Sequence, residues 1–460
     1  MSMKTSYFLK KTGALALFSM FALSFQSNAQ KKATIDGIVY QVVEVEGGDD
    51  YAETVPQAWN EDKVVPYTAA TIAIPAKVTI DEKEYTVKKI GDNSMRENPN
   101  LKTITLSDGL EIIGNSAFAG CTEITEVVVP STVQSIEDWA FHGCTKLAKI
   151  NIPDGITAIT IHTFQETGLT SIKLPASVKK VDVCAFQDAH NLASINLENV
   201  TEVGAWALYK TAITSADMTK VTKIGSEALT GTALTSVDLP NAKEIGNTAF
   251  KTCSELETVL LGESQIIQTG EWVFQNCPKL SKVILPNTLE SIDAGTFSGC
   301  FALESIVIPN SVTLLGAWAF EKSGITEIFA SWEDPNDLIT DENIFGAEEG
   351  KIDFTWKVPE EVKAAWGSEY LGYPVEVGTP ITGNEFVKVE ANVYHAAGTL
   401  YITNLSGYNA FVYALDGRIV ARFNVNADNY SASASLAPGF YILKATNGNK
   451  IAAAKFSVNQ

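Results

Sequence analysis

Six cysteines are the side chains in this sequence whose spacing most directly suggests chemistry. Five of them stand three residues after a large apolar residue that recurs along the chain, and Cys184 stands apart; the five are Cys121, Cys144, Cys253, Cys277 and Cys300. Cysteines on neighbouring repeats would lie near disulfide distance, but three in succession always leave one unpaired. There is no close C-x-x-C pair and no nearby histidine pair, which a zinc site would need. We therefore expect buried free thiols, with a disulfide ladder as the alternative, and no metal site.

Four tryptophans share another recurring position, two residues before the same apolar residue: Trp139, Trp206, Trp272 and Trp318. A stacked aromatic strip could bind sugars or peptides, but these four do not come from adjacent repeats, so we expect packing at the edge of the repeats. The four histidines offer little material for catalysis. His142 and His162 lie in neighbouring repeats at different positions, whereas His190 and His395 are isolated, and surface or packing roles are expected for all of them.

Acidic residues gather after the last repeat, in a run made of Glu333, Asp334, Asp337, Asp341 and Glu342. Calcium prefers such oxygen ligands, but the run lacks the ligand spacing of an EF-hand, so a solvated loop is expected. The sequence contains no G-x-S-x-G, H-E-x-x-H or phosphate-binding glycine motif, and we expect neither an enzyme nor a bound cofactor. The formal net charge of −20 argues against a nucleic-acid partner.

The elements that would position these side chains follow from an internal repeat of 21–24 residues. Its clearest marker, here called the anchor, is one large apolar residue per copy: Met95, Phe118, Phe141, Phe164, Phe186, Leu208, Leu229, Phe250, Phe274, Phe297 and Phe320. A second apolar residue stands five positions before each anchor, except at Thr269, and is often followed by a glycine that eases a bend. After each anchor comes an L-x-x-I-x-L segment, whose last positions alternate as in a strand with one buried face.

A single copy, with one short strand and a compact segment that leads back to the next strand, cannot bury its apolar face alone, but stacked copies can. The repeat therefore predicts a solenoid with a parallel sheet along one side. The full pattern, L-x-x-I-x-L-P…V-x-x-I-G-x-x-A-F-x-x-C, resembles the BspA-type leucine-rich repeat family, and Ile306–Phe320 shows most of it. The resemblance covers about 90–330. It implies a secreted or surface-displayed bacterial protein, and some relatives act as adhesins for host proteins. Ile35–Val45 and Val78–Val87 look like the family's N-terminal cap, and Val358–Trp366 resembles its closing segment.

The first residues have the layout of a cleaved secretory signal. Lys4, Lys10 and Lys11 precede an apolar stretch over 13–25, and small residues stand before Gln30. An uncleaved anchor is the alternative, but this stretch is shorter than the ~20 residues of a spanning helix, and no later stretch is long enough. We expect a signal peptide at 1–29, an N-terminal β cap at 30–90, the solenoid at 91–330, its C-terminal cap at 331–377, a linker at 378–384 and a β-sandwich at 385–460.

After the linker the pattern changes to short strands with hairpin signals at Asp416-Gly417 and Asn447-Gly448. The predicted strands are Phe386–Val389, Thr399–Thr403, Ala410–Ala414, Ile419–Asn424, Ser431–Ser435, Gly439–Ala445 and Lys450–Val458. The motifs Asp416-Gly417-Arg418 and Leu436-x-Pro438-Gly439-x-Tyr441 resemble C-terminal sorting domains of the type IX secretion pathway; a structural or anchoring module is the alternative. The whole chain is thus expected to be an α/β, β-rich leucine-rich repeat solenoid with a C-terminal all-β sandwich.

The solenoid offers one outward face, formed by the residues beside the middle apolar position of L-x-x-I-x-L. The position after it is polar through the middle of the solenoid but apolar in the last four copies: Leu260, Ile284, Val307 and Phe329. An exposed apolar stripe with a polar rim would mark a partner-binding site. Strand propensity, together with cover from the cap after Ala330, is the alternative explanation.

These features predict a secreted or cell-surface binding protein that presents a solenoid face to a protein or glycan ligand, as an adhesin does. Because a fold alone does not fix a function, two other classes stay open. One is a passive structural protein of the envelope, and the other, which is less favoured, is a secreted hydrolase.

Overall fold

The computed structural model describes residues 30–60, 63–262, 264–341, 343–346 and 354–378, and then 387–388, 392–396, 399–403, 408–414, 419–427, 429–434, 436, 439–447 and 450–458. The predicted signal peptide, most of the predicted linker, Asp416-Gly417 and Gly448 of the hairpin signals, and Glu342 of the acidic run lie outside these residues. Within them, buried apolar side chains form two separate cores, one between Ile38 and Val375 and the other between Leu400 and Val458.

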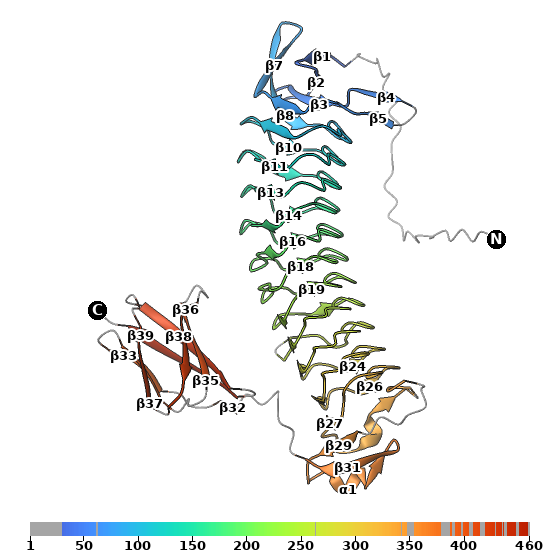
Figure 1. The fold of residues 1–460 in the computed structure, drawn as a ribbon, viewed down its shortest axis with the longest axis vertical. Coiled ribbons are helices and arrows are strands. Elements are labelled where there is room, and N and C mark those ends of the chain that lie inside the picture. Colours follow the sequence, from blue (N-terminus) through green and yellow to red (C-terminus); the bar gives the residue numbers. More distant parts are fainter. Residues whose placement is uncertain are drawn as a thin grey trace, which may run out of the picture.

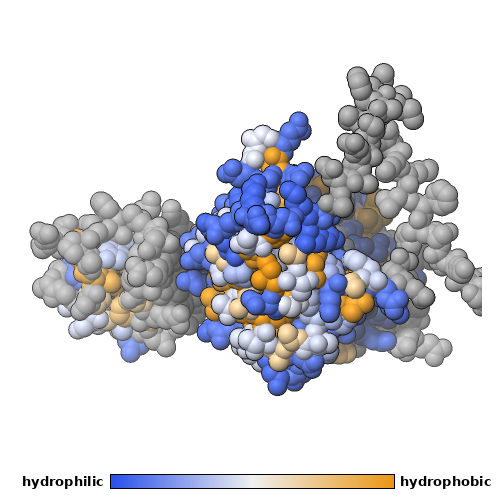
Figure 2. Space-filling view, turned by 90° about the horizontal axis from the view of Figure 1, so that it is seen from above, coloured by the Kyte–Doolittle hydropathy of each residue, from blue (hydrophilic) through white to orange (hydrophobic). Residues whose placement is uncertain are grey.

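A group of β-strands stands at the N-terminal end of the solenoid (Figure 1). Its antiparallel strands β1 (Lys32–Ile35), β2 (Ile38–Val43) and β3 (Tyr51–Val55) lead to β8 (Lys83–Ile90), which pairs parallel with β3 and antiparallel with β7 (Lys77–Ile80). A small hairpin of β4 (Ala58–Asn60) and β5 (Lys63–Val65) follows β3 in the chain. Seen from this end, the surface is largely hydrophilic with small hydrophobic areas (Figure 2).

The L-x-x-I-x-L segments form a parallel ladder along the solenoid. The strands pair in parallel with equivalent strands of neighbouring repeats in short groups, so that Val127 lies beside Ile150 and Val259 beside Val283. The strands are β6 (Thr71–Ile74), β9 (Thr103–Leu106), β11 (Glu126–Val127), β13 (Lys149–Ile150), β15 (Ser171–Ile172), β17 (Ser194–Ile195), β20 (Ser236–Asp238), β22 (Thr258–Leu260), β23 (Lys282–Ile284), β25 (Ser305–Val307) and β27 (Glu327–Phe329). The predicted parallel sheet is therefore confirmed.

A second parallel ladder runs through the apolar residue five positions before each anchor, where the sequence indicated only a bend. Its strands are mostly two residues long, too short to show an alternating pattern, and one residue of each points into the core, as Val181 does after Lys180. They are β10 (Ile112–Ile113), β12 (Ser135–Ile136), β14 (Ala158–Ile159), β16 (Lys180–Val181), β18 (Glu202–Val203), β19 (Lys223–Ile224), β21 (Glu244–Ile245), β24 (Ser291–Ile292), β26 (Leu314–Leu315) and β28 (Ile339–Thr340).

Each anchor sits in a turn that is hydrogen-bonded to the next repeat. The anchor amide donates to the carbonyl just before the next anchor, as from Phe118 N to Ala140 O at 2.8 Å. The same bond joins Phe320 N to Ile344 O at 2.9 Å, so Phe345 is one further anchor. The sequence pattern misses this copy because Thr340 replaces the usual apolar residue five positions earlier.

The phenylalanine anchors stack through the core of the solenoid. Ring centroids lie 5.3–5.8 Å apart along two columns, Phe118–Phe141–Phe164–Phe186 and Phe250–Phe274–Phe297–Phe320. Leu208 and Leu229 stand between the columns, and all of these anchors are fully buried. Because the same contact recurs at every turn, the stability of the solenoid is expected to come from interactions between neighbouring repeats.

Two asparagines on the outward face extend the first ladder with side-chain hydrogen bonds. The Asn151 amide nitrogen donates to Val129 O at 2.8 Å, and its oxygen accepts from Val129 N at 2.8 Å. Asn196 makes the same pair of bonds with Leu174, at 3.0 and 2.7 Å. Each asparagine therefore satisfies both backbone groups of a buried residue in the preceding repeat.

Replacing Asn151 by alanine is expected to lower the free energy of unfolding by about 1–3 kcal/mol, because it leaves the N–H and C=O groups of Val129 without these bonds. Urea denaturation followed by circular dichroism measures the change. Lys173→Ala is the matched control, since Lys173 occupies the same outward position with an exposed side chain. Equal losses for both variants would contradict the role assigned to Asn151.

The solenoid closes with β29 (Thr355–Val358), α1 (Lys363–Trp366), β30 (Glu369–Tyr370) and β31 (Tyr373–Val377). Trp366 is buried and its Nε1 donates to Trp332 O at 2.9 Å, so the predicted closing segment packs against residues that follow the last L-x-x-I-x-L strand. Among the described residues, helix is limited to α1 and the 3-10 helix η1 (Pro335–Asp337), and neither is long and apolar enough to cross a membrane. The fold is thus a β-solenoid with almost no α component.

The C-terminal residues form the predicted all-β sandwich from two groups of paired strands. One contains β32 (Val387–Lys388), β39 (Lys450–Val458), β38 (Gly439–Asn447), β35 (Tyr408–Ala414) and β36 (Ile419–Val425). The other contains β33 (Asn392–Ala396), β34 (Thr399–Thr403) and β37 (Asn429–Ser433). Strand β33 was not predicted from the sequence; the other strands were, with small shifts at their ends.

Candidate functional site

The outward face of the first ladder is where the sequence placed a binding stripe. The four predicted residues keep equivalent places in the ladder, because Leu260 pairs with Ile284 and Val307 pairs with Phe329. Elsewhere in the same position the side chains are exposed, as at Thr105, and Val128 is 65% exposed. The outward direction of this position is therefore confirmed.

The stripe is not exposed along its length. Ile284 and Phe329 are each only 5% exposed, whereas Leu260 and Val307 are half-buried. Gly262 lies over Ile284, since a Cβ on this glycine would come within 2.9 Å of Ile284 Cγ2. Phe329 is flanked in the ladder by Lys357 of β29, which belongs to the closing segment. The expectation of one exposed stripe is thus wrong for two of its four residues.

The tryptophans lie at the edge of the repeats in an unusual backbone conformation. Their φ angles are +54° to +62°, in the left-handed region that bulky residues rarely adopt. This conformation directs each amide to the next repeat, as from Trp272 N to Ala294 O at 2.7 Å and from Trp318 N to Asn343 O at 2.8 Å. The whole position shares it, from Asn93 to Trp318, so it belongs to the repeat and not to tryptophan.

Two of these tryptophans meet across the intervening repeat. The rings of Trp272 and Trp318 are stacked with centroids 5.9 Å apart. Gly295 occupies the position between them, and a Cβ there would lie 1.9 Å from the Trp272 ring, so the missing side chain lets the indoles approach. Packing at the repeat edge, as predicted, is part of their role, but Trp318 stays 39% exposed.

An exposed apolar group that the sequence analysis missed lies on the second ladder, close to its C-terminal end. Leu314 and Ile339 are directly paired on β26 and β28, and they are 38% and 65% exposed. Ile267 is 54% exposed and lies beside β24, the strand that precedes β26 in this ladder. The Ile267 carbonyl accepts a hydrogen bond from Ser291 N of β24. We call the adjacent residues Leu314 and Ile339 the apolar patch. Ile267 and Trp318 are further exposed apolar residues in the same stretch of repeats, where Trp272 is half-buried.

Three of the four histidines come from successive repeats. Trp139 stacks on His162 with centroids 3.7 Å apart and meets His142 edge-on at 4.9 Å. Burial lowers the pKa of His142, which favours its neutral form at pH 7. Sequence reasoning missed the contacts among Trp139, His142 and His162, because it compared the two histidines, which occupy different positions of the repeat, and Trp139 shares its position only with His162.

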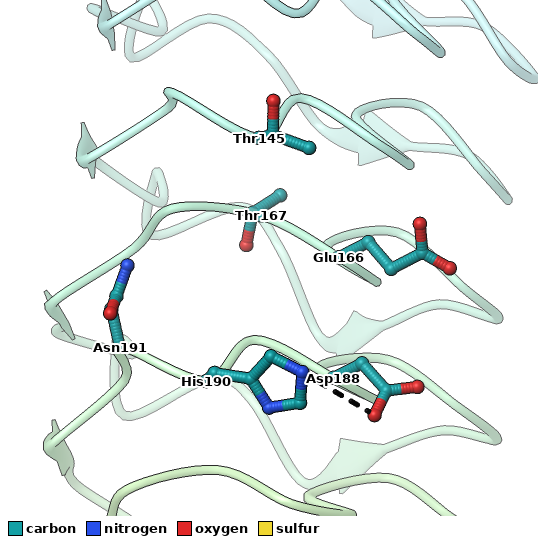
Figure 3. A pocket seen from close by; sticks show the side chains of 6 residues that line it. All are labelled: Thr145, Glu166, Thr167, Asp188, His190 and Asn191. Atoms are coloured by element: carbon teal, nitrogen blue, oxygen red, sulfur yellow. Dashed lines mark ion pairs between the residues drawn. The ribbon is translucent and has the colours of Figure 1, made fainter.

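His190 lines a neighbouring polar pocket of about 410 Å3, together with Thr145, Glu166, Thr167, Asp188 and Asn191 (Figure 3). Its Nε2 lies 3.9 Å from Asp188 Oδ1, and its Nδ1 lies 3.0 Å from Lys210 O. In the part of the chain that the structure describes, no three histidine, cysteine or carboxylate side chains converge as metal ligands would. Within the acidic run, Asp334 accepts from Asn336 N at 2.9 Å and begins η1.

The six cysteines, all within the described residues, are buried free thiols, as predicted. Those in the recurring position donate to the anchor carbonyl of the preceding repeat, as from Cys121 Sγ to Met95 O at 3.0 Å and from Cys300 Sγ to Phe274 O at 3.2 Å. Burial raises the pKa of Cys121 to about 12. A buried thiol with a raised pKa is a poor nucleophile, and burial raises the pKa of Cys144 and Cys300 as well. At Cys253, burial is outweighed by hydrogen bonds with Cys277 and Thr232, which lower the pKa.

The repeat is recognised by a model of the BspA type leucine rich repeat region, which matches residues 76–166, 111–232 and 222–335. The chain belongs to this family. A solved leucine-rich repeat protein from Bacteroides ovatus is 22% identical and has the same fold, with a TM-score of 0.51 over 75% of this chain and 99% of that one. The pneumococcal vaccine antigen PcpA is 18% identical, with a TM-score of 0.42 over 76% of this chain and 99% of that one. No curated protein matches the chain.

Membership of the BspA-type family rests on the solenoid and the end of its N-terminal cap. The matched segments end at 335, before the closing segment and the β-sandwich. The likeness of the sandwich to sorting domains of the type IX pathway therefore stays a prediction from its short motifs.

Proposed function

We propose that this BspA-type repeat protein is an exported, surface-associated binding protein whose solenoid docks a protein partner. Support for export comes from the predicted signal peptide, and the β-sandwich would serve for sorting or anchoring. Support for binding without catalysis comes from the buried thiols of Cys121 and Cys300, whose raised pKa makes them poor nucleophiles.

The apolar patch is the observation that carries this proposal. Leu314 and Ile339 lie side by side on paired strands, and both are exposed. The equivalent places further up the ladder hold charged side chains, such as Glu202, Lys223 and Glu244. Exposed apolar groups gathered on one stretch of an otherwise polar surface mark interaction sites, and side chains of this kind bind apolar and aromatic groups of another protein. Leu260 and Val307, although half-buried on the other ladder, would be a secondary contact.

The test begins with chemical cross-linking of the exported protein on intact cells to identify its partner, followed by a direct binding assay with that partner in purified form. In this assay, Leu314→Thr combined with Ile339→Thr is expected to weaken binding at least tenfold, because it removes apolar surface while keeping β-compatible residues. Thermal stability should stay near that of the wild type, since both side chains are exposed.

Lys223→Thr combined with Glu244→Thr is the matched control, because these residues hold the equivalent positions in a polar part of the same ladder. Unchanged binding by the Leu314/Ile339 variant would reject the patch as the docking site. If cross-linking on cells gives only self-association, or no partner, the passive structural role is favoured.

A further inference from the structure

A concave site lies where the N-terminal cap meets the first repeat. It has a volume of about 450 Å3 and is lined by residues of β1, β2, β3 and β4 and by the turn after β8. Its floor contains one row of side chains that crosses four paired strands, in which Lys32 is opposite Gln41, Gln41 opposite Glu53, and Glu53 opposite Lys89. A strand spacing of ~4.8 Å makes this row roughly 14 Å long.

One wall of this cleft is formed by β4. Every residue of β4 is exposed, and Trp59 lines the cleft with 59% of its surface open to solvent. Leaving an indole this open in water gains little apolar burial for the fold. The exposed side chain of Trp59 is therefore available to contact a ligand in the cleft.

The polar groups of the floor are held in place before any ligand arrives. Gln41 Nε2 donates to Glu53 Oε1 at 2.5 Å, and Lys89 Nζ lies 2.8 Å from Asp92 Oδ1. Gly91 fixes the end of the cleft, because its amide donates to Thr54 O at 3.1 Å and a Cβ there would lie 2.1 Å from that oxygen. Preorganised polar groups beside an apolar wall are the usual composition of a ligand site.

The charges of the lining balance. Lys32 and Lys89 face Glu53 and Asp92, so the site offers both donors and acceptors without favouring an ion. Hydroxyl groups both donate and accept, and the C–H face of a pyranose ring packs flat on an indole. We propose that this cleft binds a neutral oligosaccharide, with Trp59 stacking on a sugar ring and the Lys32–Gln41–Glu53–Lys89 row binding its hydroxyls.

This inference does not depend on the apolar patch or on its protein partner, because the cleft is in the N-terminal cap. Isothermal titration of the full mature chain with maltotriose, cellotriose, mannotriose and triacetylchitotriose tests it directly. Binding of at least one of these sugars is expected. Trp59→Ala should weaken that binding roughly tenfold or more, and Trp59→Phe should restore part of it, because stacking needs an aromatic face.

Trp206→Ala is the control, since Trp206 is also part-exposed but belongs to the solenoid edge and should leave the affinity unchanged. Leu314→Thr with Ile339→Thr should likewise retain sugar binding, which separates this site from the protein-docking site. The proposal is overturned if none of the four sugars binds, if Trp59→Ala binds as well as the wild type, or if acidic trigalacturonate or a tripeptide binds in preference to every neutral sugar.

Discussion

Replacing Phe141 by alanine is expected to lower the free energy of unfolding by about 3–5 kcal/mol. Phe141 is fully buried, and its ring is stacked between those of Phe118 and Phe164, at 5.3 and 5.7 Å. Truncation removes the apolar surface of one repeat and also a packing partner of both neighbours. Because a solenoid is stabilised chiefly by contacts between neighbours, the loss is expected to spread along the rod.

Two measurements check this expectation. Urea denaturation gives the total loss of stability, and hydrogen exchange should show the greatest loss of protection in the repeats carrying Phe118, Phe141 and Phe164. Phe301→Ala is the matched control, because Phe301 is 63% exposed and its loss should change stability by less than about 0.5 kcal/mol. A loss below about 1 kcal/mol for Phe141→Ala would show that the aromatic column does not hold the repeats together.

The length of the repeat and the position of its anchor could be predicted from the sequence, because each copy must place one large apolar side chain at the equivalent position in the core. Phe118 and Phe297 hold that place in copies far apart in the chain, so their spacing alone reveals the repeat length. The second ladder could not be predicted in the same way. Its strands contribute one inward residue each, such as Val181, and hydrogen bonds between repeats leave no local pattern in a sequence.

The predicted binding stripe failed for a different reason. Alternation along a strand correctly gave the outward direction of Ile284, but direction is not exposure. Gly262, which belongs to the preceding repeat, lies against Ile284. Its position depends on the length of the segment that connects one strand to the next, and alternation along a strand does not reveal this. The exposure of Leu314 and Ile339 could not be predicted either, because Leu314 stands in a segment interpreted as a bend and Ile339 in the expected C-terminal cap.

The tryptophan position shows a third limit of the sequence. Trp272 and Trp318 were predicted not to form a strip because another repeat separates them. Gly295 stands between them and has no side chain, so the two rings can approach each other and stack. A glycine in the intervening repeat can therefore bring aromatic side chains of non-adjacent repeats into contact. A search for aromatic residues in adjacent repeats does not reveal such a contact.

Raising the pH above about 9 is expected to destabilise the solenoid through its buried thiols. Burial raises the pKa of Cys121 and of Cys300 to about 12, and it raises that of Cys144 as well. An unfolded chain titrates these thiols near their ordinary pKa of about 8.5. Below that value both states keep the protons, and the pH has no effect through these groups. Above it, only the folded state keeps them, so stability falls as the pH rises and goes on falling to about pH 12 for Cys121 and Cys300.

The expected slope follows from the number of thiols involved. Each contributes about 1.4 kcal/mol per pH unit once the unfolded thiol is ionised, so Cys121, Cys144 and Cys300 together contribute about 4 kcal/mol per unit. The pKa of Cys184 and of Cys277 is also raised, so these thiols add to the loss, whereas the pKa of Cys253 is lowered. Urea midpoints measured between pH 7.5 and pH 10 cover the window in which thiols ionise before most tyrosines and lysines do. The matched variant carries Cys121→Ala, Cys144→Ala and Cys300→Ala. This variant should be less stable at pH 7.5, because small cavities replace the sulfurs, but its stability should fall less steeply with pH. A variant whose stability fell as steeply as that of the wild type would show that other groups cause the alkaline loss.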